Sequence, residues 1–204
     1  MIPGRYGHPS MQPRADVYVS VDIEADGRIP LVHSMSSIGA AVAGRFDGHE
    51  FTRADPTAQT FYAELQPVSD EYDPRAAAVA GLDREVLRRD GEPPEAAMRR
   101  FAAWVGDVAG AGRPVFVAYP ASFDWTWVSI YLDRFAGENP FGFSGVLDMK
   151  TMYATRARVR ISRAVKREMP RALLSTRPHT HNARDDAIEQ ADLFANLFEW
   201  AGPA

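Results

Sequence analysis

The 204-residue sequence contains no cysteine, and this absence excludes disulfide bonds and thiolate metal sites. It also contains no run of about 18 consecutive apolar residues, which excludes an ordinary transmembrane helix. Residues 1–15 lack the apolar core that a secretory signal peptide carries. The cytoplasm is therefore the compartment that we expect.

The N-terminal residues are rich in Pro, Gly and Arg, and we predict a disordered tail over residues 1–15. Met11 lies within this tail, so translation could start at either Met1 or Met11. Apolar residues make up 46% of the chain and charged residues 25%, as is usual for a globular domain. Residues 16–204 are enough for one domain with a sizeable core.

Acidic residues outnumber basic ones, 27 to 23, and give a net charge of −4. This balance argues against a passive nucleic-acid binder. The charge distribution is uneven: residues 1–149 hold 13 of the 23 basic residues and 21 of the 27 acidic ones. The following segment has a single acid, Glu168, and nine basic residues: Lys150, Arg156, Arg158, Arg160, Arg163, Lys166, Arg167, Arg171 and Arg177. Such a segment is either a phosphate-binding patch or a solvated helical face.

Alternation of apolar and polar residues predicts the first strand of a sheet. From Val17 to Ile23 the odd-numbered residues are apolar, whereas Ser20 and Asp22 fall between them. This period of two is that of a β-strand. Further strands are expected over residues 36–42, 60–65 and 115–119.

Helical spacing of apolar residues predicts three longer helices, over residues 92–105, 122–135 and 182–200. Ser122 and Asn182 are the expected N-caps of the second and third of these helices. Residues 148–177 are expected to form short helices joined by loops. Three strands come first and helices are interleaved later, which predicts an α/β fold with a mixed central β-sheet flanked by α-helices.

Asp22 and Glu24 lie two residues apart on the first expected strand, so their carboxylates project from the same face. Carboxylates this close repel each other and resist joint ionisation unless a cation lies between them. The same spacing occurs at Asp83–Glu85 and Asp90–Glu92, but outside the expected strands. The alternative is an exposed strand end, because strand interiors disfavour Asp.

Three more residues complete a candidate site, although each also has a purely structural interpretation. Asp124 lies in the first turn of a helix, where the helix dipole favours an acid. His181 precedes the last helix and is the one histidine of five with an Asp five positions later, Asp186. A catalytic site is favoured because all these residues occur together, in a fixed order and at the ends of expected elements. The candidate set is Asp22, Glu24, Asp124, His181 and Asp186.

The sequence around these residues resembles the DEDDh-type 3′–5′ exonucleases of the ribonuclease H-like superfamily. The first family motif matches over residues 21–27, the second over residues 121–124 and the third over residues 181–187. Residues 81–87 and 147–151 are also similar to the family. The resemblance extends over about residues 16–200 and implies a ribonuclease H-like fold.

Metal-dependent phosphodiester hydrolysis is what the resemblance implies for these five residues. Asp22, Glu24 and Asp186 would ligate a first metal ion, Asp22 would bridge to a second, and Asp124 would support the second. Two Mg²⁺ or Mn²⁺ ions suit hard oxygen ligands, and such a pair activates a water and stabilises the leaving oxygen. His181 would accept the proton of that water, since an imidazole side chain suits a general base.

The implied products are nucleoside 5′-monophosphates released from the 3′ ends of single-stranded RNA or DNA, with RNA slightly favoured. Candidate substrate contacts are Ser36, Ser37 and Met35 on the second strand, and the aromatic residues Phe123, Trp125 and Tyr119, which could stack on a base. Core packing is the alternative for these aromatic residues, and Trp127 is assigned to the core. The resemblance also suggests a homodimer.

Pro120 departs from the family pattern, because many relatives carry Asn four residues before the Asp of the second motif. The same fold is still expected with Pro120, but the way in which the substrate is held can differ from that in these relatives. A catalytically silent nucleic-acid-binding or interaction module on the same fold is therefore an alternative. A third possibility is an enzyme that acts on mononucleotides or very short oligonucleotides.

Overall fold

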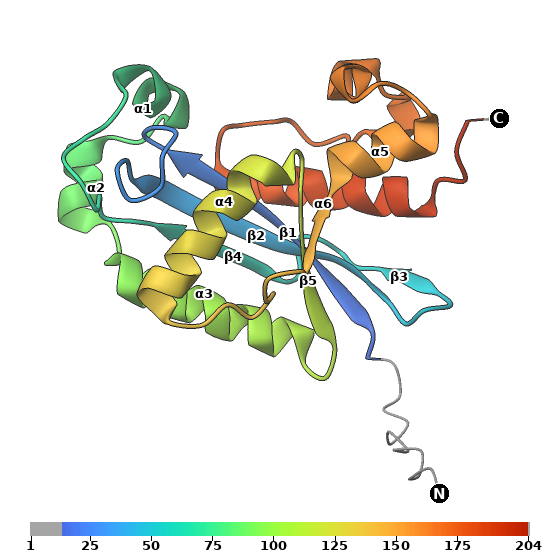
Figure 1. Cartoon of the computed structure of the whole chain (residues 1–204), viewed down its shortest axis with the longest axis horizontal. Coiled ribbons are helices and arrows are strands. Elements are labelled where there is room, and N and C mark those ends of the chain that lie inside the picture. The colour runs from blue at the N-terminus through green and yellow to red at the C-terminus, as the bar shows by residue number, and fades with distance from the viewer. Residues whose placement is uncertain (1–13, 204) are drawn as a thin grey trace, which may run out of the picture.

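A mixed six-stranded β-sheet forms the centre of the computed structural model, which describes residues 14–203 (Figure 1). The strands are β1 (Asp16–Ala25), β2 (Met35–Phe46), β3 (Phe51–Arg53), β4 (Thr60–Glu64), β5 (Arg113–Ala118) and β6 (Val146–Asp148). Their order is β3-β2-β1-β5-β6, and β4 also pairs with β2. β2 is antiparallel to β1, β3 and β4, whereas β1, β5 and β6 run parallel. The predicted mixed sheet is confirmed.

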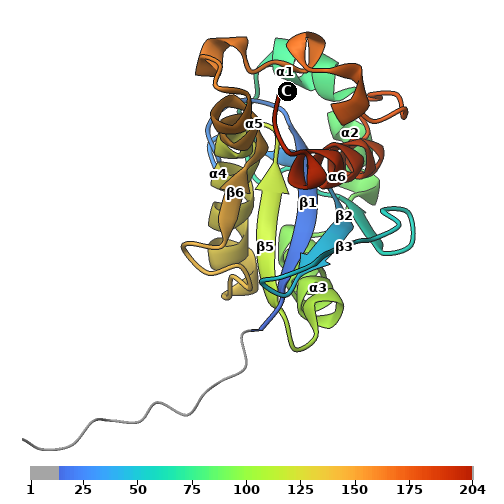
Figure 2. The ribbon, with the colours of Figure 1, turned by 90° about the vertical axis from the view of Figure 1, so that its right-hand side faces the viewer.

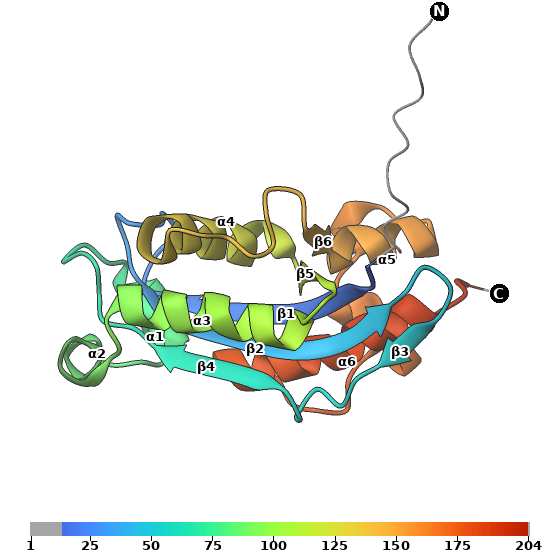
Figure 3. The same cartoon turned by 90° about the horizontal axis from the view of Figure 1, so that it is seen from below.

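Helices cover both faces of this sheet, as Figures 2 and 3 show. One face carries α3 (Pro94–Ala109) and α4 (Ala121–Tyr131), which continues into a π-helical turn over Leu132–Ala136. The other face carries α6 (Ala183–Glu199). The remaining elements are α1 (Pro74–Ala80), α2 (Arg84–Asp90), α5 (Met149–Ala157) and the short 3-10 turns Ile161–Arg163, Lys166–Glu168 and Arg171–Leu173.

The alternation along β1 sorts its side chains between two hydrophobic cores. Val17, Val19 and Val21 are fully buried in the core that includes α3 and α4. Tyr18 belongs to the second core, beneath α5 and α6. Each buried valine contributes about 1.5–3 kcal/mol from removal of apolar surface, so the orientation of β1 is strongly fixed. As a result, Asp22 and the other even-numbered residues face α6.

Several short elements were not predicted from the sequence. Strands β3 and β6 have three residues each, and helices α1 and α2 have seven each, which is too short for a clear periodicity. Residues 1–13 of the predicted tail, with Met11, lie outside the described residues. Ala15 already accepts a backbone hydrogen bond from Arg113.

The predicted N-cap Ser122 is wrong, because α4 begins earlier and its N-cap is Pro120, which makes no side-chain cap bond. A carboxylate from β6 takes that role: Asp148 Oδ2 accepts a 2.7 Å hydrogen bond from the amide of Ala121. Its other oxygen accepts from Thr151 N at 2.6 Å and caps α5. Asn182, by contrast, caps α6 as predicted, accepting from two backbone amides.

Within residues 14–203, no helix combines the length and the apolar character needed to cross a bilayer.

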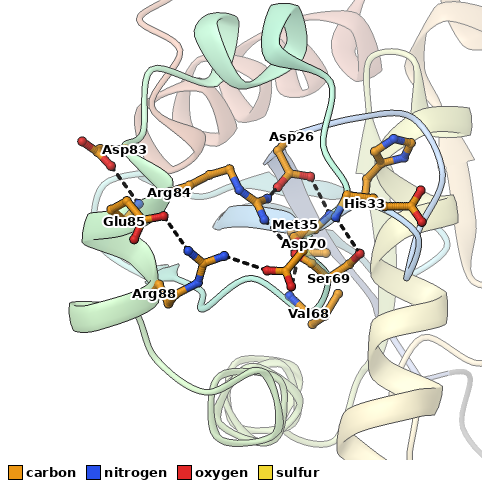
Figure 4. Close-up of polar contacts among 12 residues, drawn as sticks. Asp26, His33, Met35, Val68, Ser69, Asp70, Asp83, Arg84, Glu85 and Arg88 are labelled. Carbon is orange, nitrogen blue, oxygen red and sulfur yellow. Dashed lines mark hydrogen bonds and ion pairs between the residues drawn. The ribbon is translucent and has the colours of Figure 1, made fainter.

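A buried ion pair fixes the end of β1 (Figure 4). Asp26, two residues beyond Glu24, is 1% exposed and pairs with the guanidinium of Arg84 on α2. The Asp26 carboxylate also accepts a 2.6 Å hydrogen bond from Ser34 N, and Arg84 donates to Ser69 O at 2.7 Å. Arg84 therefore ties together the end of β1, the loop after β4 and the start of α2.

Replacing Arg84 by Met should lower the free energy of unfolding by about 3–5 kcal/mol, because the buried Asp26 carboxylate would lose its counter-charge. Urea denaturation measures this change. Arg88→Met is the matched control: Arg88 pairs with Asp70, which is 98% exposed, so its loss should cost less than about 1 kcal/mol. An equal decrease in the free energy of unfolding for the two variants would show that Arg84 is not the counter-charge that the buried Asp26 requires.

Candidate active site

Three carboxylates converge near the C-terminal half of β1 and the start of α6. Figures 1 and 3 show how these two elements lie. Asp22 and Glu24 project from the face of β1 that α6 covers, and Asp186 lies in the first turn of α6. One oxygen from each of the three lies within 4.8 Å of the others. Asp186 is fully buried, whereas Asp22 and Glu24 are partly exposed.

A glycine on β2 makes this convergence possible. Gly39 lies opposite Asp22 in the antiparallel pairing of β1 and β2. A Cβ atom at position 39 would lie 2.2 Å from the backbone of both Ala183 and Arg184. The first turn of α6 therefore rests directly on the β2 backbone, which brings Asp186 down to the carboxylates of β1.

Asp124 reaches the same place from the opposite helix layer. The paired residues of β1 and β5 end at Ser20 and Val117, so the later amides of β1 have no β5 partner. Asp124 Oδ1 accepts the hydrogen bond of one of them, Ile23 N, at 3.2 Å. The Asp124 side chain is 6% exposed, and this bond fixes it beside Asp22 and Glu24.

Two residues that were not predicted from the sequence support Asp22. Gln190 Nε2 donates to Asp22 Oδ1 at 2.6 Å, while Gln190 Oε1 accepts from Tyr119 N at 2.8 Å. Gln190 lies one helical turn after Asp186, and this i,i+4 spacing was a usable signal. Lys166, from the basic segment, pairs with Glu189 at 2.5 Å, and its charge lowers the pKa of Asp22, although burial and the neighbouring carboxylates outweigh it.

The loop before α6 holds Asp186 through its backbone. Thr180 N donates to Asp186 Oδ1 at 2.8 Å, and His181 N donates to Oδ2 at 2.9 Å. His181 has a left-handed φ of 57°, and its side chain is exposed. His179, which was not singled out from the sequence, places Nδ1 3.1 Å from Asp186 Oδ2.

The candidate substrate contacts fall in different surroundings. Ser37 pairs with Glu24 across the sheet, and Ser36 is the extra residue of a β-bulge; both serines are buried. Phe123 is 41% exposed beside Asp124. Trp125 packs against Phe116 and Phe141 and lines a hollow of about 510 Å³ that includes Pro120 and Lys150 but none of the four carboxylates. Trp127 is 1% exposed, as predicted for the core, Met35 is buried, and the Tyr119 hydroxyl bonds to Ala164 O.

Comparisons with known proteins identify a family for this chain. The family described as the 3′–5′ exoribonuclease Rv2179c-like domain matches residues 17–198. The 3′–5′ DNA exonuclease Cap18 of Escherichia coli is 37% identical over 187 residues, which are 90% of this chain and 92% of Cap18. The chain belongs to the Rv2179c-like family. The predicted membership among DEDDh 3′–5′ exonucleases, and with it the class of hydrolytic exonuclease, is confirmed.

Solved structures show the same fold at low sequence identity. The nuclease domain of 3′hExo, a DEDDh family member bound to rAMP, superposes with a TM-score of 0.63 at 14% identity, covering 94% of each chain. Exonuclease I of E. coli in complex with a dA16 oligonucleotide gives a TM-score of 0.59 at 17% identity. That match covers 91% of the present chain and 41% of exonuclease I. The predicted ribonuclease H-like fold is confirmed.

The carboxylates of this cluster resist joint ionisation. Burial raises the pKa of Glu24 from 4.5 to about 7, with repulsion from Asp186 and Asp124 adding to the effect. Burial likewise raises the pKa of Asp124 from 3.8 to about 7, against the opposing hydrogen bond from Ile23 N. The pKa of Asp22 is raised well above its usual range, by burial first and then by the neighbouring carboxylates. Such a cluster accepts protons or cations.

Divalent cations fit this donor set. The three converging carboxylate oxygens are hard ligands, and the chain has no cysteine thiolate that could replace them. Their negative charges repel one another until a cation binds between them. Divalent metal dependence follows from membership in the DEDDh exonucleases and agrees with the acidic groups present. When bound, such ions polarise the scissile phosphate and lower the pKa of an attacking water.

Without metal, stability should fall as the pH rises through about 7. The pKa values of Glu24 and Asp124 are higher in the folded state than in the unfolded state, so the folded state binds protons more tightly. This stabilisation is complete below about pH 4 and is lost as the pH rises through the folded pKa values. Glu24 contributes less than Asp124, because water screens its partly exposed side chain.

Magnesium should reverse the trend, because the metal binds the ionised carboxylates. The Tm in Mg²⁺ should exceed the Tm in EDTA by a margin that grows by several degrees between about pH 5 and pH 8. Each kcal/mol of added stability raises the Tm of a domain of this size by ~2–4 °C. Thermal melts across this pH range measure this margin. A gain independent of pH would show that these carboxylates are not the metal ligands.

Proposed function

We propose that the protein removes nucleoside 5′-monophosphates one at a time from the 3′ ends of single-stranded RNA, with two divalent metal ions, Mg²⁺ or Mn²⁺. The observation that carries the proposal is the convergence of Asp22, Glu24 and Asp186, with Asp124 beside them, from three separate parts of the chain. The adjoining loop supplies an imidazole, that of His181, at the same place.

Each side chain has a role that its surroundings support. Asp22, Glu24 and Asp186 would hold one ion, and Asp22 with Asp124 would hold the other. Gln190 fixes the rotamer of Asp22, because its amide is itself anchored on Tyr119 N. His181 would accept the proton of the attacking water at a ring nitrogen; its exposed ring is free to approach substrate.

The substrate contact that the structure supports most strongly is Phe123. Phe123 exposes 41% of its surface next to Asp124, a position suited to stacking on a base near the cleaved bond. Ser37 lies beside Glu24, but it is 1% exposed, so it would support the site from within the sheet. Ser36 is enclosed in its bulge and Trp125 is turned toward Phe116, so we assign these two a supporting role.

The basic segment supports a track for the rest of the strand. Four of its nine cations have protein partners: Arg163, Lys166 and Arg177 pair with acids, and Arg156 bonds to backbone carbonyls. The other five form no ion pair within residues 14–203: Lys150, Arg158, Arg160, Arg167 and Arg171. Cations that lack internal partners are available for phosphate groups.

DNA is the second candidate substrate, because Cap18, with 37% identity, is named for DNA. The family description names RNA instead, which is why RNA stands first. Discrimination would require a contact to the 2′-OH. A catalytically silent module is disfavoured because all five residues of the DEDDh set are present.

Incubation of the protein with 3′- and 5′-labelled single strands of RNA and DNA, in Mg²⁺, Mn²⁺ or EDTA, tests the proposal. A metal-dependent ladder that shortens from the 3′ end is expected, and RNA should be the faster substrate. A faster DNA reaction would reverse the substrate assignment. No degradation of either strand would support the silent module, and activity confined to strands of a few nucleotides would support the short-oligonucleotide enzyme.

A homodimer and a cytoplasmic location also belong to the proposal. The dimer is suggested by the resemblance to DEDDh exonucleases, and light scattering on the purified chain measures the mass directly. The cytoplasmic location is suggested by the absence of cysteine, because disulfide bonds are typical of proteins in oxidising compartments. Cell fractionation tests it.

A further inference from the structure

The loop before α6 carries two histidines against a catalytic carboxylate. His179 Nδ1 lies 3.1 Å from Asp186 Oδ2, and the rings of His179 and His181 meet edge to face with centroids 4.7 Å apart. One ligand atom from each of His179, His181 and Asp186 lies within 4.8 Å of the other two. Two imidazoles and a carboxylate therefore share one small volume.

This donor set differs in chemistry from the carboxylates on β1. Imidazole nitrogen suits Zn²⁺ and related transition metals, whereas carboxylate oxygens alone suit Mg²⁺, Ca²⁺ and Mn²⁺. Three protein ligands drawn from His and Asp with an open fourth position form a common zinc arrangement. Ligand bonds of about 2.0–2.2 Å place tetrahedral donors ~3.3 Å apart, so only a modest movement of the exposed rings is needed.

The carboxylate is already oriented for such a site. Thr180 N and His181 N each donate to one oxygen of Asp186, so its rotamer is fixed by the backbone of the same loop. Hydrogen bonds of this kind orient metal ligands and strengthen binding. His179 is 53% exposed and His181 is also exposed, so an ion can enter from solvent.

We propose that His179, His181 and Asp186 form a binding site for Zn²⁺ or a similar transition-metal ion, and that its occupancy inhibits the nuclease. The inhibition rests on the proposed function, because it assigns His181 to proton transfer and Asp186 to the catalytic ions. A bound zinc ion engages the ring nitrogen of His181 and an oxygen of Asp186. Both groups are then withdrawn from hydrolysis.

Zinc binding can be measured without any activity assay. Calorimetric titration of ZnCl₂ into the full chain, in excess Mg²⁺, gives the affinity, and two-bond ¹H–¹⁵N spectra show which of the five histidine rings bind. We expect two rings to respond. Loss of a group that only supports a metal ligand lowers metal affinity roughly 10- to 100-fold. His179→Asn removes a ligand itself and should weaken zinc binding by at least that factor. His49→Asn, in the exposed turn after β2, is the matched control and should leave the affinity unchanged.

The inhibitory part is tested by the zinc concentration that halves the Mg²⁺-dependent rate, each variant being compared with its own zinc-free rate. His179→Asn should raise this concentration at least about tenfold, in step with the affinity. Circular dichroism verifies that the variant is folded. Wild-type zinc affinity or sensitivity in His179→Asn would overturn the proposal and assign zinc to the carboxylates of β1. A protein that binds zinc through two histidines but shows no nuclease activity would contradict the proposed function alone.

Discussion

Asp22→Asn is expected to reduce nucleotide release by at least about 10³-fold while leaving the protein folded. Asp22 is the carboxylate that would serve both metal ions, and several kcal/mol of transition-state stabilisation depend on these ions. Each loss of about 1.4 kcal/mol slows the reaction ten-fold. The fold should persist because the Asn oxygen can still accept from Gln190. Single-turnover cleavage of a 3′-labelled strand measures the loss.

The same substitution should stabilise the metal-free protein at pH 8. It removes one charge from a cluster in which Asp124, Glu24 and Asp186 all raise the pKa of Asp22. The Tm in EDTA is therefore expected to be higher than that of the wild type. Asp90→Asn is the control, since Asp90 starts another Asp-x-Glu triplet but pairs with Arg89 at the surface. An active Asp22→Asn enzyme would refute the assigned site.

Gly39→Ala is expected to cost about 100-fold in activity although residue 39 carries no chemistry. The added Cβ would displace the first turn of α6, whose backbone lies 2.2 Å away, and with it Asp186. A misplacement of about 1 Å can cost a factor of ~10². The overpacking should also lower the free energy of unfolding by about 1–3 kcal/mol.

Gly106→Ala is the matched control for this change. Gly106 is exposed on α3, and a Cβ there would meet nothing within 4 Å. Alanine is the better helix former, so this variant should be more stable by about 0.5–1 kcal/mol and fully active. Rate and urea denaturation are measured on both variants. Full activity of Gly39→Ala would show that α6 can be repositioned without loss.

Local sequence was sufficient to predict the features that depend on near neighbours. The alternation along β1 fixed which side chains share a face, and Asn182 caps α6 as its sequence position indicates. Asp22 and Asp186 were assigned by their place in motifs. Their proximity, however, depends on Gly39, whose importance appears only when α6 is packed on β2.

Features that join distant segments could not be predicted in this way. Asp26 and Arg84 are 58 positions apart, and neither residue type indicates a buried pair. Asp148 replaces the predicted cap of α4 because β6 brings its carboxylate to Ala121. Lys166 belongs to a segment whose charge pattern fits a solvated face equally well, and tertiary packing alone brings it close enough to affect Asp22.

The bond between Gln190 and Asp22 spans 168 positions in the chain, and this span has a consequence for biosynthesis. A chain emerging from the ribosome exposes β1 first and α6 last, so its catalytic set stays incomplete until nearly the whole polypeptide has been made. If the proposed assignment holds, a nascent chain therefore lacks nuclease activity until α6 docks on the sheet. A fragment that ends before α6 would lack both Asp186 and Gln190, and it should therefore be inactive.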